Sequence, residues 1–376
     1  MRTGFSGQSH SADGEGPPAG LPRVRWLPAS ITMRLSLTFI GLIAFACIFG
    51  PFLLPHSYDR VYRDYVLVPP SQTSHPSETE IDAAIDAIAA RLHVAITDRH
   101  RKDTLLSIML VSEKPVDPRA LRGFERSDIF GPARLVSRAE DGRRLILELP
   151  LQQQTFLFGT DANGRDLLAR ILIAGRISLA AGLLASLVAL VIGTAWGTIA
   201  GYFGGKLDML MMRIVEIIYA LPFIFLVILL VVVFGRHFVL IFVAIGAVEW
   251  LDMARIVRGQ TLSLKRRDYV LAAEALGARA PAILWRHIIP NALGPIAAYL
   301  TLLVPRIILL ESFVSFLGLG VQEPLTSWGL LIADGARNIQ SSLHLLVFPA
   351  LFLAGTLAAL NRLGESWRDA LGLRDA

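Results

Sequence analysis

Six long apolar runs constrain this chain more than any other feature of its sequence. A helix needs roughly 20 apolar residues to cross about 30 Å of hydrocarbon. Only 18% of the 376 residues are charged, whereas a soluble chain usually carries about 25%. We therefore predict an all-α polytopic membrane protein with six transmembrane helices. The runs that would form them lie at 35–54, 177–201, 214–234, 238–254, 295–318 and 343–362.

Basic residues in the short connections predict the orientation of these helices. Lys and Arg gather in cytoplasmic loops, and the segment 255–290 holds seven of them. The two short loops on the other side hold one each, Arg236 and Arg337. We therefore expect both termini in the cytoplasm, with 1–34 and 365–376 as tails.

A long segment between the first two apolar runs, 55–155, is typical of a soluble domain, and the orientation places it outside the cytoplasm. Apolar residues at helical spacing predict a helix over 78–93, and two apolar runs predict strands over 104–111 and 144–149. We expect a small α+β extracytoplasmic insert between helices 1 and 2. The core domain would follow over 156–364.

Catalytic and nucleic-acid-binding patterns are absent from the sequence. Residues 56–176 hold 17 basic and 17 acidic residues, so the external segment is neutral and unsuited to nucleic acid. Gly204-Gly205-Lys206 ends like a phosphate-binding loop, but Leu207 replaces the required Ser or Thr. One cysteine, Cys47, excludes a multi-cysteine metal site. We expect no catalytic, cofactor-binding or metal-binding residue on this chain.

The basic loop 255–290 carries the most informative local pattern. Asp268 is suited to cap a short helix that Gly277 ends in the left-handed conformation. Pro281 suits the first turn of a second short helix, which we expect to close before Pro290. The alanines of the first helix would allow close approach to another protein. Contact with anionic lipid is the alternative, and the residues alone leave both open.

The same loop resembles the "EAA" loop of bacterial ABC importer permeases, whose two short coupling helices dock on an ATPase. With Gly277 on the motif glycine, both motif alanines are present, and Leu271 replaces the motif glutamate. Glu274 lies three residues out of register with that glutamate. The resemblance implies ATPase contacts from Tyr269, Ala272, Ala273, Gly277, Arg286, His287, Pro290 and Asn291.

Other segments extend the resemblance to the oligopeptide, dipeptide and nickel branch of these permeases. The stretches 250–265 and 311–329 are similar to that branch, and the likeness covers roughly 30–56 and 155–376. The insert is longer than the family pattern leads us to expect. A GTDxxGRD motif before the second span is formed by Gly159, Thr160, Asp161, Gly164, Arg165 and Asp166.

The resemblance implies a permease subunit that translocates oligopeptides across the bacterial inner membrane. Such a subunit pairs with a second permease subunit, two cytoplasmic ATPases that bind ATP and Mg, and an extracytoplasmic solute-binding protein. Membrane lipid surrounds it, and no nucleic acid is involved. Dipeptides, nickel complexes or sugars are alternative solutes for this branch. A membrane-anchored sensor or assembly factor is the alternative from another class.

Charged residues within the apolar runs are expensive and therefore functional candidates. Arg306 and Glu311 lie in one predicted span, about 140° apart around an ideal helix. One of them would face the translocation path, or they would have an interhelical structural partner such as Asn291 or a residue of another subunit. We expect Glu249 and Asp252 to form ion pairs with residues Arg255 or Arg258.

Overall fold

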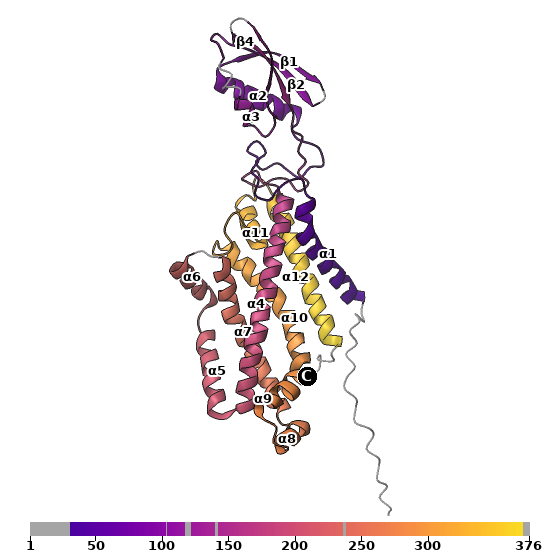
Figure 1. The fold of residues 1–376 in the computed structure, drawn as a ribbon, viewed down its shortest axis with the longest axis vertical. Helices are drawn as coiled ribbons and strands as arrows, with labels where there is room; N and C mark the ends of the chain where they lie inside the picture. The colour runs from indigo at the N-terminus through magenta and orange to yellow at the C-terminus, as the bar shows by residue number, and fades with distance from the viewer. Residues whose placement is uncertain (1–30, 103, 117–121, 140–141, 236–237, 371–376) are drawn as a thin grey trace, which may run out of the picture.

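The structure, a computed structural model, describes residues 31–102, 104–116, 122–139, 142–235 and 238–370 (Figure 1). A long bundle of helices carries an α+β unit at one end and a short helical loop at the other. Most of the two predicted tails, and Arg236, lie outside the described residues.

The bundle contains every apolar run that the sequence predicts as a span. Among the described residues, four helical stretches are long and apolar enough to cross a membrane, and a bent helix pair is a candidate fifth. The helices of the bundle are α1 (Ile31–Leu53), α4 (Leu167–Phe203), α5 (Gly205–Tyr219), α6 (Phe223–Phe234), α7 (Phe238–Leu264), α10 (Ile289–Phe316), α11 (Trp328–Arg337) and α12 (His344–Ala370).

The predicted span 214–234 is wrong as a single helix. The chain bends by 78° between α5 and α6. Pro222 precedes α6, and its ring and missing amide hydrogen favour a kink or a break in the helix there. Proline also disfavours helical geometry at the residue before it, here Leu221. A strongly bent pair of helices therefore replaces the predicted single helix.

The predicted end of the second loop helix before Pro290 is also wrong. Helix α9 (Ala280–Ile283) continues through a π-helical turn, η3 (Leu284–Ile288), into α10. Pro290 is the second residue of α10 and comes directly after the π-helical turn, so it does not end the helix. The second half of the loop is thus joined without a break to a long apolar helix.

Helices α4 and α7 pack closely through glycines. A Cβ atom on Gly193 would lie 2.6 Å from Cβ of Met253, and one on Gly201 would lie 2.8 Å from Cβ of Thr261. Such distances are shorter than atoms tolerate, so only glycine permits this approach. The contact fixes α7, and with it the loop that follows α7, against α4.

The α+β unit is a four-stranded antiparallel sheet, in the order β1-β2-β4-β3, with a helix on one face. Ile81, Ile85 and Ile88 of the helix are buried in a core shared with the alternating apolar residues of two strands. The predicted helix and both predicted strands are present. The elements are α2 (Glu78–Leu92), β1 (Ala95–Lys102), β2 (Leu105–Val111), α3 (Arg122–Glu125), β3 (Arg134–Ala139) and β4 (Arg144–Pro150).

Candidate functional site

The loop after α7 has the helix, glycine and helix order that the sequence predicts. Helix α8 (Asp268–Ala275) is followed by Gly277, which has a φ of +80°, and the chain then enters α9. Asp268 is not the cap, because Arg267 occupies that position and Asp268 is the first helical residue. Its carboxylate still lies at the positive end of the helix dipole, where negative charge is favourable.

A small buried cluster holds this loop against the bundle. Val270, Ile283 and Ile288 are fully buried and pack with Tyr202 at the end of α4. The Tyr202 hydroxyl donates a hydrogen bond to Glu274 over 3.0 Å. Lys265 Nζ donates to the backbone oxygen of Tyr202 over 2.5 Å. The loop is therefore fixed to the ends of α4 and α7. A displacement of the loop would move these two helices.

The outer side of the loop exposes large apolar side chains. Leu276 is 88% exposed and Trp285 is 73% exposed, and Tyr269 and Leu271 are exposed beside them. We call these four residues the coupling surface. Sequence reasoning missed Leu276 and Trp285. Two sequence features could have indicated them: Leu276 is an apolar residue next to a glycine that ends a helix, and Trp285 lies beside an arginine in a basic loop.

The predicted contact residues lie on the same loop as the coupling surface. Ala272, Gly277, Arg286, Pro290 and Asn291 are exposed, whereas Ala273 and His287 are half-buried. The rings of Tyr269 and His287 lie 6.2 Å apart. Asn291 Nδ2 donates to the backbone oxygen of His287 over 2.6 Å, so its hydrogen bond lies within the loop and not with Arg306 or Glu311.

The motif before α4 forms a buried network of ion pairs and hydrogen bonds. Asp161 Oδ1 accepts the backbone amides of Asn163 and Arg165, each over 2.8 Å. Its other oxygen accepts Arg165 Nε over 2.8 Å and also Arg170 Nη1. Arg165 reaches on to Glu323, over 2.7 Å, and this hydrogen bond holds the pKa of Glu323 below its usual range. Two buried arginines thus share one buried carboxylate.

The rest of the motif attaches α4 to the segment that follows α1. Thr160 Oγ1 donates to the backbone oxygen of Tyr65 over 2.6 Å and accepts the amide of Val68 over 2.9 Å. Gly164 has a φ of +75°, and a Cβ atom there would overlap the backbone of Tyr62. Gly159 also has a positive φ. These contacts give the motif a structural role at the joint between insert and bundle.

Asp166 makes the last connection of the motif. It caps α4 by accepting the amide of Ala169 over 3.1 Å, and it accepts a hydrogen bond from His56 Nδ1 over 2.7 Å. The other ring nitrogen of His56 lies 2.7 Å from Gln154 Oε1. Because both partners are oxygen acceptors, the protonated imidazole satisfies both contacts.

We expect the contribution of His56 to stability to depend on pH. Hydrogen bonding to Asp166 raises the pKa of His56 above its usual value. A raised pKa stabilises the fold fully below the unfolded value of about 6.5, and this contribution is lost as pH rises through the folded value. The His56→Gln variant should therefore lose more Tm against the wild type at about pH 5.5 than at about pH 9. An equal loss at both pH values, measured by thermal unfolding in detergent, would contradict this.

Arg306 and Glu311 lie in different surroundings, in line with their predicted separation around the helix. Glu311 is fully buried and accepts hydrogen bonds from Ser178 over 3.0 Å and Ser315 over 2.8 Å. It faces α4 inside the bundle. Its partners are serines, whereas Asn291, the example expected from the sequence, donates to the backbone oxygen of His287. Glu311 therefore makes an interhelical contact between α10 and α4.

Arg306 pairs with acidic residues of α7, which the sequence assigned to other partners. Its Nη1 donates to Asp252 over 2.9 Å, and its Nε lies 3.7 Å from Glu249. Asp252 also lies 3.7 Å from Arg255, so the pair expected from the sequence is present, at a longer distance than the pair of Asp252 with Arg306. Arg258 pairs instead with Asp208, over 2.5 and 2.6 Å. These pairs join residues about 50 positions apart, which spacing along one helix does not predict.

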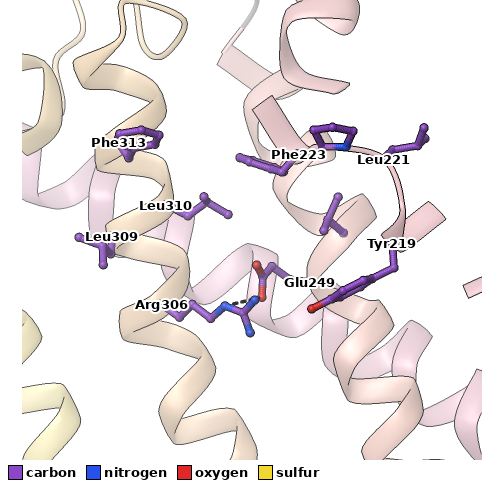
Figure 2. Close-up of a pocket in the computed structure, with 10 residues that line it drawn as sticks. Tyr219, Leu221, Phe223, Glu249, Arg306, Leu309, Leu310 and Phe313 are labelled. Carbon is purple, nitrogen blue, oxygen red and sulfur yellow. Dashed lines mark ion pairs between the residues drawn. The ribbon is translucent and has the colours of Figure 1, made fainter. Parts of the chain in front are cut away.

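Arg306 and Glu249 also line a cavity of about 630 Å³ beside the bend between α5 and α6. Figure 2 shows Tyr219 and Phe223 on the side of the bend, with Leu310 and Phe313 on α10 opposite. Most of the wall is apolar, and the two charged side chains meet within it.

Long apolar helices, charges paired between them and a cavity at a broken helix are the features of a membrane transport protein. Residues 193–374 match the family of binding-protein-dependent transport system inner membrane components. Residues 33–70 match the N-terminal TM domain of oligopeptide transport permease C. These two ranges lie on either side of the α+β unit, which runs from Glu78 to Pro150.

Curated relatives match more than half of the chain. The oligopeptide transport system permease protein OppC of Haemophilus influenzae is 54% identical over 226 residues, which is 60% of this chain and 73% of the relative. Its Escherichia coli K12 counterpart is 56% identical over 226 residues, covering 60% and 75%. The dipeptide transport system permease protein DppC of Bacillus subtilis is 46% identical over 216 residues, covering 57% and 67%.

The chain therefore belongs to the binding-protein-dependent transport permeases of the oligopeptide permease C type. This confirms the family that the loop and the GTDxxGRD motif predicted. The chain is a multi-pass protein of the bacterial inner membrane.

Proposed function

We propose that this chain is the permease subunit of an ATP-driven importer that translocates oligopeptides across the inner membrane. The observation that carries the proposal is the coupling surface, which is exposed on its outer side and fixed on its inner side to α4 and α7. A surface held in this way can receive movement from another protein and pass it to the spans. The relatives named as oligopeptide permeases support the choice of solute.

We propose six spans, with both termini in the cytoplasm. The bent pair α5 and α6 forms the third span, and α7 forms the fourth, its charges being paired with one another and with Arg306. Figure 1 shows that the start of α1 and the end of α12 are both directed toward the end of the bundle that carries α8. This agrees with a cytoplasmic loop 255–290, an extracytoplasmic insert over 55–155 and a core permease domain over 156–364.

The proposed partners follow from this orientation. Two ATPase subunits, which carry ATP and Mg, would dock on the coupling surface of this chain and of a second permease subunit. A solute-binding protein would deliver peptide at the opposite end. No cofactor is proposed for this chain. Contact with anionic lipid is the competing use of the loop. Helix α8, which ends next to the exposed Leu276, projects beyond α5 in Figure 1, and this position favours a protein contact.

Dipeptides are a second candidate solute. The observation that favours them is the 46% identity to the dipeptide permease of Bacillus subtilis. Deleting the gene in its host and measuring uptake of radiolabelled dipeptides, tripeptides and pentapeptides separates the two. Loss of tripeptide and pentapeptide uptake is expected. Unchanged uptake of all three peptides would contradict the proposed function.

The insert is expected to be dispensable for membrane insertion and ATPase binding. Its core is largely its own, and its base is closed by a pair of backbone hydrogen bonds between His75 and Gln154, over 2.7 and 2.8 Å. Replacing residues 78–148 by a short Gly-Ser linker should therefore leave the bundle intact. Co-purification with the ATPases measures this. Loss of both insertion and co-purification would show that the insert is part of the permease fold.

A further inference from the structure

The cavity at the bend between α5 and α6 holds a buried carboxylate that is incompletely paired. Glu249 is only 3% exposed, and its Oε2 has no hydrogen-bond partner among the described residues. The nearest cation is Arg306, whose Nε lies 3.7 Å away, beyond hydrogen-bond distance. Arg306 directs its hydrogen bond to Asp252 instead. Burying a charge is costly unless it is paired, so Glu249 is suited to accept a further cationic donor.

The cavity around Glu249 has the size and lining of a small-molecule site. Its volume of about 630 Å³ lies within the range of roughly 300–1,000 Å³ that such sites occupy. Leu309, Leu310 and Phe313 of α10 form an apolar wall, and Phe223 lies across from them. Figure 2 shows the Tyr219 hydroxyl directed toward the Glu249 carboxylate.

The chemistry that fits this arrangement is an ammonium group next to an apolar side chain. Arg306 is 52% exposed, so its guanidinium can donate a hydrogen bond to a carbonyl or carboxylate oxygen. In the ligand, this oxygen would come after the ammonium group. The amino-terminal end of a peptide carries these groups in this order. The start of α6 and the bend at Pro222 close one side of the cavity. An occupant would therefore lie between this bend and α10.

We propose that this cavity binds the amino-terminal end of a peptide during translocation. The peptide ammonium pairs with Glu249, and the first side chain packs against the apolar wall of α10. This inference rests on the proposed function, because it places the transported solute within the bundle.

The test uses the assembled importer, with its ATPases and binding protein, in proteoliposomes. The probes are the tripeptide phenylalanyl-alanyl-alanine and its N-acetylated form, each radiolabelled. The binding protein discriminates between the two probes equally in every variant, so the ratio of their uptake rates isolates the permease. Glu249→Gln keeps the size of the side chain and removes its charge. Glu216→Gln is the matched control, because Glu216 is exposed on α5 and pairs with Arg213.

Glu249→Gln should lower uptake of the free tripeptide by at least about tenfold, since losing one partner of a buried charge pair is expensive. Uptake of the acetylated form should stay unchanged, and Glu249→Asp should restore part of the preference. Glu216→Gln should change neither rate. An unchanged ratio in Glu249→Gln, or an equal loss for both probes, would overturn the proposed site. Failure of the wild type to import either probe would instead contradict the proposed function.

A second measurement does not depend on changing Glu249. Photoreactive benzoylphenylalanine in place of Leu309 should capture the free tripeptide on illumination during turnover. The same group in place of Leu351, which is exposed on α12 and outside the cavity, should not. Equal capture at both positions, or none at Leu309, would overturn the proposed site.

Discussion

Replacing Gly277 with glutamate is expected to abolish peptide uptake and to release the ATPases, while the protein still inserts into the membrane. Gly277 has a φ of +80°, where a residue with a side chain is strained by about 1–2 kcal/mol. Apart from its two chain neighbours, no heavy atom of the described residues lies within 4 Å of the position that a Cβ would take, so the variant should not disturb packing. The new carboxylate would lie in the coupling surface next to Leu276. Uptake should fall by about 100-fold or more, because an unpaired charge buried in an interface costs several kcal/mol.

The matched variant for this experiment is Gly277→Asn. Asparagine tolerates positive φ better than other residues with side chains, and it carries no charge. It should retain most of the uptake and most of the ATPase on co-purification. Normal transport and normal co-purification of Gly277→Glu would contradict the assignment of this loop as the ATPase contact.

Replacing Asp161 with alanine is expected to give the largest loss of stability. Asp161 is buried and binds two buried arginines, Arg165 and Arg170. Removing one partner of a buried ion pair typically costs about 3–5 kcal/mol, because the remaining charge stays buried without a partner. Such a loss should lower Tm by about 5 °C or more, and less folded protein should reach the membrane.

The control for Asp161→Ala is Glu216→Ala. Glu216 forms an exposed ion pair with Arg213 over 2.9 Å, and exposed pairs contribute about 0–1 kcal/mol. Its Tm should therefore stay close to that of the wild type. If Asp161→Ala unfolds at the same temperature as Glu216→Ala, the motif does not hold α4 to the segment after α1.

The sequence predicted those elements of the fold that have a periodic pattern of apolar residues. The helix at 78–92 and strands β2 and β4 have a clear period of buried residues. Strands β1 and β3 are exposed at nearly every position, so they carry no such alternation and were not predicted. Pro222 in the run 214–234 indicates a kink from proline chemistry alone, but not a bend as large as 78°.

Long-range contacts limited what the sequence could predict about the site. Gly277 was predicted because its conformation depends on the glycine itself. The partners of Arg306 and the hydrogen bond between Tyr202 and Glu274 join residues more than 50 positions apart, which only the packing of α4, α7 and α10 brings together. The exposure of Leu276 and Trp285 depends in the same way on which side of the loop faces Tyr202.

The most direct test of the proposed function is ATP-driven uptake by a purified complex. This chain is reconstituted in proteoliposomes with its partner permease, the two ATPases and the binding protein, and radiolabelled tripeptide is supplied outside. We expect accumulation that requires ATP, together with peptide-stimulated ATP hydrolysis, and loss of both when the chain carries Gly277→Glu. Uptake that proceeds equally without ATP, or a complex that imports peptide equally well when this chain is left out, would contradict its assignment as a permease subunit.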